Sequence, residues 1–232
     1  MGQKKLVVRL KMELNIASFN MRGFSSGAGM LKDLASSYML IALQEHWLRD
    51  EELDRISDIC PDFNFKSISA MNEKLTEGIF RGRPFSGLAL MWHNSLNPFI
   101  KFLASDEFNR VLAFKLSLAN HSIILFNVYF PCYADGVQYR NTLSMITGFM
   151  ECVIDKNTDC SEYIVAGDMN FELTTCNSGY RIFKSFADNF NITDCDDLMH
   201  RNCSDKRTFI NEFYDMVHVL IISLFPCPYY HS

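Results

Sequence analysis

The stretch Tyr163-Ile164-Val165-Ala166-Gly167-Asp168-Met169-Asn170 runs from a short apolar segment directly into two polar side chains. A short apolar run bounded by turn-forming residues predicts a buried strand. Asp168 and Asn170 follow at its end, where a side chain is held rigidly and still meets solvent. Taken alone, Gly-Asp-x-Asn is also the composition of an ordinary turn, in which Gly and Asn adopt positive φ. The remaining sequence has to distinguish these two interpretations.

Other apolar segments end in polar residues in the same way. Residues 14–19 lead into Asn20, and residues 39–43 lead into Gln44 and Glu45. Residues 122–130 are almost wholly β-branched or aromatic, which is typical of a central strand covered on both faces. Apolar or alternating patterns predict two more strands, at 86–92 and 111–118.

Three segments between these strands carry apolar residues at helical spacing, at 50–60, 137–155 and 179–190. Because strands and helices do not alternate strictly, the pattern predicts sheets packed face to face with helices outside. No internal repeat or low-complexity linker is visible. We therefore expect one domain at 13–223, between an N-terminal tail at 1–12 and an atypical C-terminal tail at 224–232.

The composition is that of an ordinary globular protein. The 232 residues are 48% hydrophobic and 21% charged, and the formal net charge is −5. An acidic chain cannot bind nucleic acid by charge alone, so a phosphate substrate would need bound cations. The longest apolar run is too short for a membrane span, and no secretory, myristoylation or other targeting signal is visible. We expect an intracellular protein without membrane association, whose eight cysteines, lacking any Cys-x-x-Cys pair, are reduced.

Four polar residues at expected strand ends form a candidate site: Asn20, Glu45, Asp168 and Asn170. Two carboxylates and two amides make an oxygen-rich set, which hard cations such as Mg²⁺ select. Such a cation would neutralise a phosphate and lower the pKa of a water nucleophile. The set therefore predicts a metal-assisted phosphoryl reaction.

Five motifs, in one order, resemble those of the endonuclease/exonuclease/phosphatase superfamily. They are SFNMRG at 18–23, LQEHWL at 43–48, RPFSG at 83–87, NVYFP at 127–131 and GDMN at 167–170. That group includes the apurinic endonucleases, deoxyribonuclease I and the endonuclease domains of LINE-type (non-LTR) retrotransposons. The phrases QEHWL at 44–48 and TFIN at 208–211 make the retrotransposon branch the best fit.

The resemblance implies a deoxyribonuclease I-like α/β fold, a four-layered sandwich of two mixed β-sheets face to face with helices outside. It also implies a phosphodiester hydrolase that nicks DNA, depends on Mg²⁺ or alternatively Mn²⁺, and acts in the nucleus without an obligate protein partner. Glu45 would be the main metal ligand, and Asn20 would help to place metal or phosphate. Arg83, in a Gly-rich loop, would contact the DNA backbone or remain solvated.

The resemblance also assigns roles in catalysis. Asp168 would orient and deprotonate the attacking water as a general base. Asn170 would steady that water or bind a phosphate oxygen of the substrate. Tyr129 would donate to the phosphate as charge builds on it.

The C-terminal motifs depart from the family pattern, which has Ile-Asp-His after Thr-Phe and then Ser-Asp-His on a last strand. Val217 stands at the first Asp position. Asp215 lies two residues earlier, roughly 6–7 Å away along a strand, and His218 is a further uncertain substitute. No Asp-His dipeptide occurs in the chain. We therefore expect a C-terminally truncated domain that lacks its last strand and has an incomplete site.

Two alternatives keep the fold and change the function. One is a catalytically dead remnant that binds nucleic acid or protein; the other is a phosphoesterase that acts on a lipid or inositol phosphate. We expect Trp47 and Trp92 in the core, with stacking of Trp47 on a base if it lines the cleft. We expect His46 beside the site or at the surface, not as a metal ligand, because hard cations prefer oxygen.

Overall fold

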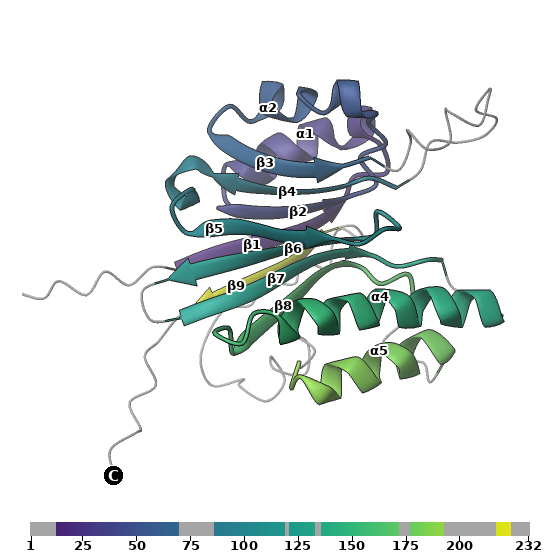
Figure 1. The fold of residues 1–232 in the computed structure, drawn as a ribbon. Helices are drawn as coiled ribbons and strands as arrows, with labels where there is room; N and C mark the ends of the chain where they lie inside the picture. The colour runs from purple at the N-terminus through teal and green to yellow at the C-terminus, as the bar shows by residue number, and fades with distance from the viewer. Residues whose placement is uncertain are drawn as a thin grey trace, which may run out of the picture.

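The computed structural model describes residues 13–69, 86–118, 121–132, 136–171 and 177–192, and the backbone of a strand at 217–223. Two β-sheets pack face to face and helices cover their outer faces (Figure 1). This confirms the predicted four-layered α/β sandwich. None of the helices in the described ranges is long and apolar enough to cross a membrane.

The first sheet has five strands in the order β3-β4-β2-β1-β9. They are β1 (Glu13–Asn20), β2 (Leu40–Gln44), β3 (Phe63–Ile68), β4 (Leu88–His93) and β9 (Val217–Ser223). Strands β1 and β2 are parallel, with Asn20 opposite Gln44. Their carboxyl ends therefore meet at one edge of the sheet.

The second sheet has four strands in the order β5-β6-β7-β8. They are β5 (Ile100–Ser105), β6 (Val111–Leu118), β7 (His121–Tyr129) and β8 (Glu162–Asp168). Strands β7 and β8 are parallel, with Tyr129 opposite Asp168. The predicted strands at 111–118, 122–130 and 163–166 lie here, and β7 is buried along most of its length, as expected for a central strand.

The two-residue period of the strands divides the core into layers. One cluster fills the space between the sheets, and Leu14 and Ile16 of β1 meet Leu125 of β7 there. The outer face of the first sheet packs on α1 (Phe24–Ala35) and α2 (Arg55–Ile59). The outer face of the second sheet packs on α4 (Val137–Asp155) and α5 (Ser178–Asn189).

The predicted helices at 137–155 and 179–190 are confirmed as α4 and α5. The single helix expected at 50–60 is wrong: a 3₁₀ turn η1 (Asp50–Glu52) precedes the short α2. Glu52 Oε2 accepts from the Arg49 backbone N–H at 3.2 Å and from Arg49 Nε at 3.1 Å. These bonds close a separate turn before α2 begins. A further 3₁₀ turn, η2 (Asn94–Leu96), follows β4.

The C-terminal expectations fall partly outside the described residues. Strand β9 pairs with β1, and Val217, at the position where the family pattern has Asp, lies opposite Phe19. We expected no further strand at 224–232, and this stays a prediction because those residues lie outside the described part of the chain.

Candidate active site

Asn20, at the end of β1, joins the two predicted carboxylates. Its Nδ2 donates to Glu45 Oε1 at 2.9 Å and to Asp168 Oδ2 at 2.8 Å. Its Oδ1 accepts from the backbone N–H of Arg22 at 3.0 Å, which fixes the orientation of the amide. Three of the four predicted residues, from two different sheets, are thus in direct contact.

Glu45 follows β2 and is half-buried. Its second oxygen, Oε2, accepts from Trp47 Nε1 at 3.2 Å. The expectation that Trp47 lies in the core is wrong, because this bond holds the indole at the site, where it remains half-exposed. Trp92 is also half-exposed, and its Nε1 donates to Asn97 Oδ1 at 2.7 Å.

Asn170 holds the carboxylate of Asp168 in place. The backbone N–H of Asn170 donates to Asp168 Oδ1 at 2.9 Å, and Asn170 Nδ2 donates to the Phe130 carbonyl at 2.7 Å. The exposed Cys132 thiol lies against Asn170 Oδ1, with an Sγ–Oδ1 distance of 3.8 Å. The GDMN motif is thus bonded to the residue after β7, and the bond from Asn170 fixes the orientation of the Asp168 carboxylate.

Tyr129 is the last residue of β7, and its side chain is buried. Burial, together with the charge and hydrogen bond of the Glu45 carboxylate, raises the pKa of the Tyr129 phenol. The hydroxyl is therefore a proton donor throughout the physiological pH range. The Arg110 guanidinium lies 5.6 Å from the Tyr129 ring centre, and Arg110 Nη1 donates to the Tyr129 carbonyl at 3.1 Å.

A buried polar pair beneath the site, absent from our predicted site residues, ties the two sheets together. Gln44 Nε2 donates to Asn127 Oδ1 at 2.8 Å, and both side chains are almost fully buried. Asn127 Nδ2 donates to the carbonyls of Leu43, at 3.0 Å, and Ala89, at 2.9 Å. Because Gln44 precedes Glu45 and Asn127 lies two residues before Tyr129, this pair sets the spacing of the two sheets at the site.

Several residues of the site adopt a left-handed backbone conformation. The φ angles are 54° at Glu45, 58° at Trp47 and 52° at Asn170. For a residue as bulky as Trp this conformation is costly, and such strain clusters at functional sites and ligand clamps. Gly167 has φ 143°, and a Cβ there would lie 2.0 Å from the Val128 carbonyl oxygen. Only glycine therefore fits between β8 and β7 just before Asp168.

His46 lies in the core next to Glu45 in the chain, which agrees with the expected position beside the site and excludes the alternative at the surface. Its side chain is fully buried, accepts from the backbone N–H of Leu48 at Nδ1, and contacts Ser67 Oγ and the Ile68 carbonyl through Nε2, each at 3.1 Å. Burial lowers the pKa of His46 to about 4. A Cβ on Gly87 would lie 2.5 Å from its ring, so glycine is required there. His46 supports the loop that carries Glu45.

For the other three predicted site residues, the structure gives no side-chain position. Arg83 and Asp215 lie outside the described residues. His218 lies in β9, and its backbone is opposite Ser18, two residues before Asn20 on β1.

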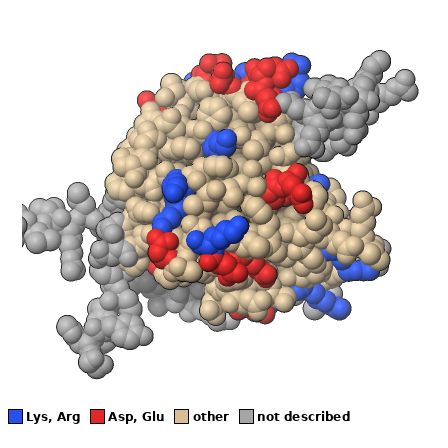
Figure 2. All heavy atoms as spheres, in the orientation of Figure 1, with Lys and Arg blue, Asp and Glu red and all other residues tan. Residues whose placement is uncertain are grey.

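Surface charge in the described part of the chain does not mark a single binding face. In the view of Figure 2, acidic and basic side chains are interspersed, and acidic groups gather around η1, which contributes Asp50, Glu51 and Glu52. Two basic residues contact the site: Arg22 through its backbone N–H, with an exposed side chain, and Arg110 through its guanidinium. Within the described residues, no basic patch on this face marks a phosphate-binding surface.

The donor set fits a hard divalent cation held by few protein ligands. In the described ranges, no cluster of three or more His, Cys, Asp or Glu side chains occurs. The oxygen donors at the site are the carboxylates of Glu45 and Asp168; Asn20 contacts both through Nδ2, and its Oδ1 accepts from the Arg22 backbone N–H. Mg²⁺ is commonly bound by one or two carboxylates and completes its shell with water and substrate phosphate.

Solved structures share this fold. An AP endonuclease, LMAP from Leishmania major, is 17% identical, with a TM-score of 0.59 over 77% of this chain and 67% of that chain. The human Nocturnin catalytic domain is 12% identical, with a TM-score of 0.56 over 91% of this chain and 82% of that chain. An AP endonuclease from Archaeoglobus fulgidus is 15% identical, with a TM-score of 0.53 over 82% and 75%. No protein-family model and no curated protein sequence matches this chain.

Proposed function

We propose that this chain belongs to the endonuclease/exonuclease/phosphatase superfamily and is a Mg²⁺-dependent phosphodiester hydrolase that nicks DNA. We further propose an origin in the endonuclease domain of a LINE-type retrotransposon, a single domain at 13–223, and action on DNA in the nucleus. The observation that carries the proposal is the amide of Asn20, which joins Glu45 and Asp168 across two sheets. Two of the neighbours in fold are AP endonucleases by name, which supports a DNA substrate.

In the proposed reaction, Asp168 accepts a proton from the attacking water, whose oxygen forms a bond to phosphorus while the bond to the leaving oxygen breaks. The backbone N–H of Asn170 donates to Oδ1 and Asn20 Nδ2 donates to Oδ2, so each Asp168 oxygen is held by one hydrogen bond and keeps a lone pair that can accept the proton. Tyr129 remains protonated and donates to the phosphate as charge builds on it. The leaving oxygen takes its proton from solvent.

Glu45 would be the main ligand of the cation, and Asn20 would help to place the cation or the phosphate. When bound, the cation supplies positive charge that stabilises the phosphate and lowers the pKa of water. Without it, the two carboxylates would repel an anionic substrate.

Nicking of supercoiled plasmid tests the proposal. We expect relaxation in Mg²⁺ and none in EDTA or with the double variant Glu45→Gln/Asp168→Asn. A matched control is the exposed pair Glu51→Gln/Asp58→Asn on η1 and α2, which we expect to nick as the original protein does. Equal relaxation by the original protein and the site variant would contradict the proposal.

A second candidate function is a binding protein without catalysis. Val217 favours it, because β9 brings this residue opposite Phe19, next to Asn20, at the position where the family pattern has a carboxylate. Loss of one member of a cooperative catalytic unit costs several orders of magnitude in rate. DNA binding that persists in EDTA, without nicking in Mg²⁺, would select this candidate. Cleavage of an inositol phosphate in place of DNA would select the lipid-phosphate alternative.

A further inference from the structure

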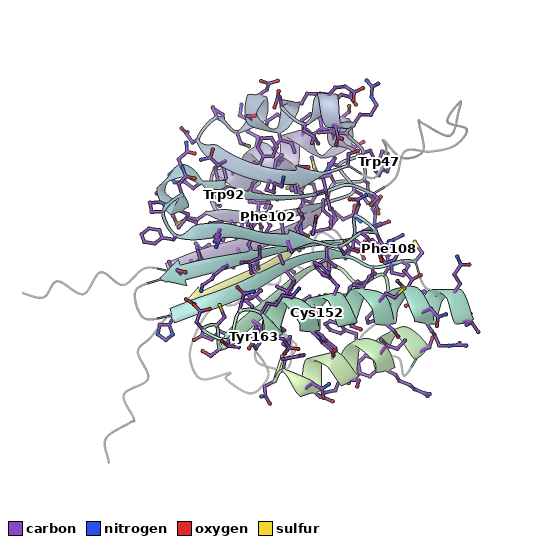
Figure 3. The ribbon with its side chains drawn as sticks, viewed as in Figure 1. Trp47, Trp92, Phe102, Phe108, Cys152 and Tyr163 are labelled. Carbon is purple, nitrogen blue, oxygen red and sulfur yellow. The ribbon has the colours of Figure 1, made fainter. Side chains whose placement is uncertain are left out.

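Two aromatic side chains, the half-exposed Trp47 and the exposed Phe108, lie on loops next to elements that carry the candidate site. Trp47 comes from the loop after β2, and Phe108 from the turn between β5 and β6. Figure 3 shows both at the same edge of the molecule, one on the side of each sheet. Large apolar groups exposed beside a polar site are ready to contact a planar ligand.

Trp47 is connected to the site by a hydrogen bond and a strained backbone. Its indole N–H donates to Glu45 Oε2 at 3.2 Å, and its φ is 58°. A Cβ on Gly23 would lie 2.5 Å from the indole Cε3, so the backbone of Gly23 packs closely on this ring. The chain thus adopts an unfavourable conformation to hold a half-exposed indole against a site carboxylate, which indicates a ligand clamp.

Phe108 is connected to the site through Arg110. Tyr129 N donates to the Arg110 carbonyl at 2.9 Å, and the Arg110 guanidinium lies over the Tyr129 ring. The side chain of Phe108, two residues earlier, is 39% exposed. The two oxygens of Glu45 accept from Asn20 and Trp47, and the Glu45 charge acts on Tyr129. Glu45 and Tyr129 therefore lie between Trp47 and the loop that carries Phe108 and Arg110.

The net negative charge of the chain disfavours binding of nucleic acid through its phosphate backbone. With a net charge of −5, the protein gains little from general attraction to a phosphate backbone. Aromatic rings bind bases by stacking, which depends neither on charge nor on base identity. Stacking on both rings requires bases that are not paired within a duplex.

We propose that Trp47 and Phe108 stack on unpaired bases that flank the phosphate bound at the site, so that the substrate is a single-stranded or locally unpaired nucleic acid. This inference rests on the proposed function, since it takes Asn20, Glu45 and Asp168 as the phosphate site. It adds a substrate class and two specificity-determining residues.

Binding can be measured without catalysis in Mg²⁺ with an Asp168→Asn variant, which lacks the proposed general base and keeps Glu45. The chain has two tryptophans. In a Trp92→Phe variant, Trp47 is the sole indole reporter. We expect a short oligothymidine to quench its emission, and to bind ~10-fold more tightly than a duplex of the same length. Equal affinity for the duplex, or no quenching, would overturn the inference.

Phe108→Ala in the same background should weaken binding of the oligothymidine roughly 5- to 100-fold, the loss of one stacked base. Phe99→Ala is the matched control, because Phe99 is 37% exposed and lies just before the other end of β5. We expect it to leave the affinity unchanged. Equal effects of the two substitutions would overturn the role of Phe108.

Failure of this inference and failure of the proposed function give different results. Nicking in Mg²⁺ without quenching of Trp47 would leave the hydrolase in place and overturn the stacking sites. Quenching with strand selectivity but no nicking would support the stacking sites and overturn the hydrolase. Quenching by vesicles of phosphatidylcholine with an inositol phospholipid, and not by the oligonucleotide, would assign the aromatic pair to a membrane surface and overturn the inference.

Discussion

Asn20 and Asp168 lie 148 residues apart in the sequence, and Asn20 Nδ2 donates to Asp168 Oδ2 at 2.8 Å. The same nitrogen donates to Glu45 Oε1 at 2.9 Å. One neutral amide therefore lies between two carboxylates that would otherwise repel each other. It reduces the free-energy cost of keeping the two carboxylates close, as the proposed cation site requires.

Asn20→Asp should make this site dependent on cations. Three neighbouring carboxylates raise one another's pKa, so the folded state favours protonation more than the unfolded state does. The free energy of unfolding should therefore fall as the pH rises from 5 to 7.5 in EDTA, by ~1–3 kcal/mol relative to the original protein. Addition of Mg²⁺ at pH 7.5 should restore most of it. Urea unfolding at both pH values measures this change.

The control is Asn141→Asp, which makes the same substitution at an exposed position in the first part of α4. It should change stability little and show no response to Mg²⁺. An equal response of the two variants to Mg²⁺ would contradict a cation site at Asn20.

Asp106 should destabilise the fold at neutral pH. Burial raises its pKa, although Oδ1 accepts from the backbone N–H groups of Arg110 and Val111, each at 2.7 Å. Its Oδ2 is buried without a partner in the described residues. A carboxyl whose folded-state pKa is raised binds protons more readily when folded, so it lowers stability above that pKa and ceases to do so as the pH falls.

Asp106→Asn keeps an oxygen for the two backbone N–H groups and removes the charge. We expect a higher melting temperature than that of the original protein at pH 8, and a difference that shrinks as the pH falls towards 4. Asp106→Ala, which also removes the acceptor, should be less stable than Asp106→Asn at every pH. A difference between Asn and Asp that grows on acidification would refute this assignment.

The Gln44–Asn127 pair should act as one unit. Asn127→Leu leaves Gln44 Nε2 buried without its acceptor and removes the Nδ2 donor from the carbonyls of Leu43 and Ala89, which should cost ~2–4 kcal/mol of unfolding free energy. Gln44→Met added to it removes one unpaired amide and should recover part of that loss, so that the two effects are not additive. Urea unfolding of both single variants and the double variant gives the coupling.

Asn64→Leu is the control for this pair, because Asn64 also donates to two side-chain acceptors, Asn94 and Asn97, near the surface of β3. It should cost less than ~1 kcal/mol. Additive losses at Gln44 and Asn127 would show that the two side chains act separately.

The sequence predicted the residues at strand ends better than the groups that support them. Asn20, Glu45 and Asp168 were recognisable because each follows an apolar run, and the structure brings all three together. The Gln44–Asn127 bond depends on how two sheets are stacked, which strand patterns do not specify. Local patterns therefore predict the strand ends, and contacts between distant segments require the structure.

Some elements and side chains were predicted wrongly or not at all. Helix α1 was missed because it contains two glycines and two serines, which weaken the helical pattern. Trp47 was assigned to the core by its hydrophobicity, although the bond from its indole to Glu45 holds it half-exposed. Burial of His46 depends on Gly87, 41 positions later in the chain, whose lack of a side chain leaves room for the ring.

The division of the site between two sheets has a consequence for folding. Asn20 and Glu45 come from the first sheet, whereas Tyr129 and Asp168 come from the second, so the contacts that join them span most of the chain and form slowly. During synthesis, a chain that has not yet extended past residue 168 carries only part of the proposed catalytic group. The proposed DNA-nicking activity should therefore be absent from nascent and partly folded molecules, and its appearance would report that the two sheets have docked.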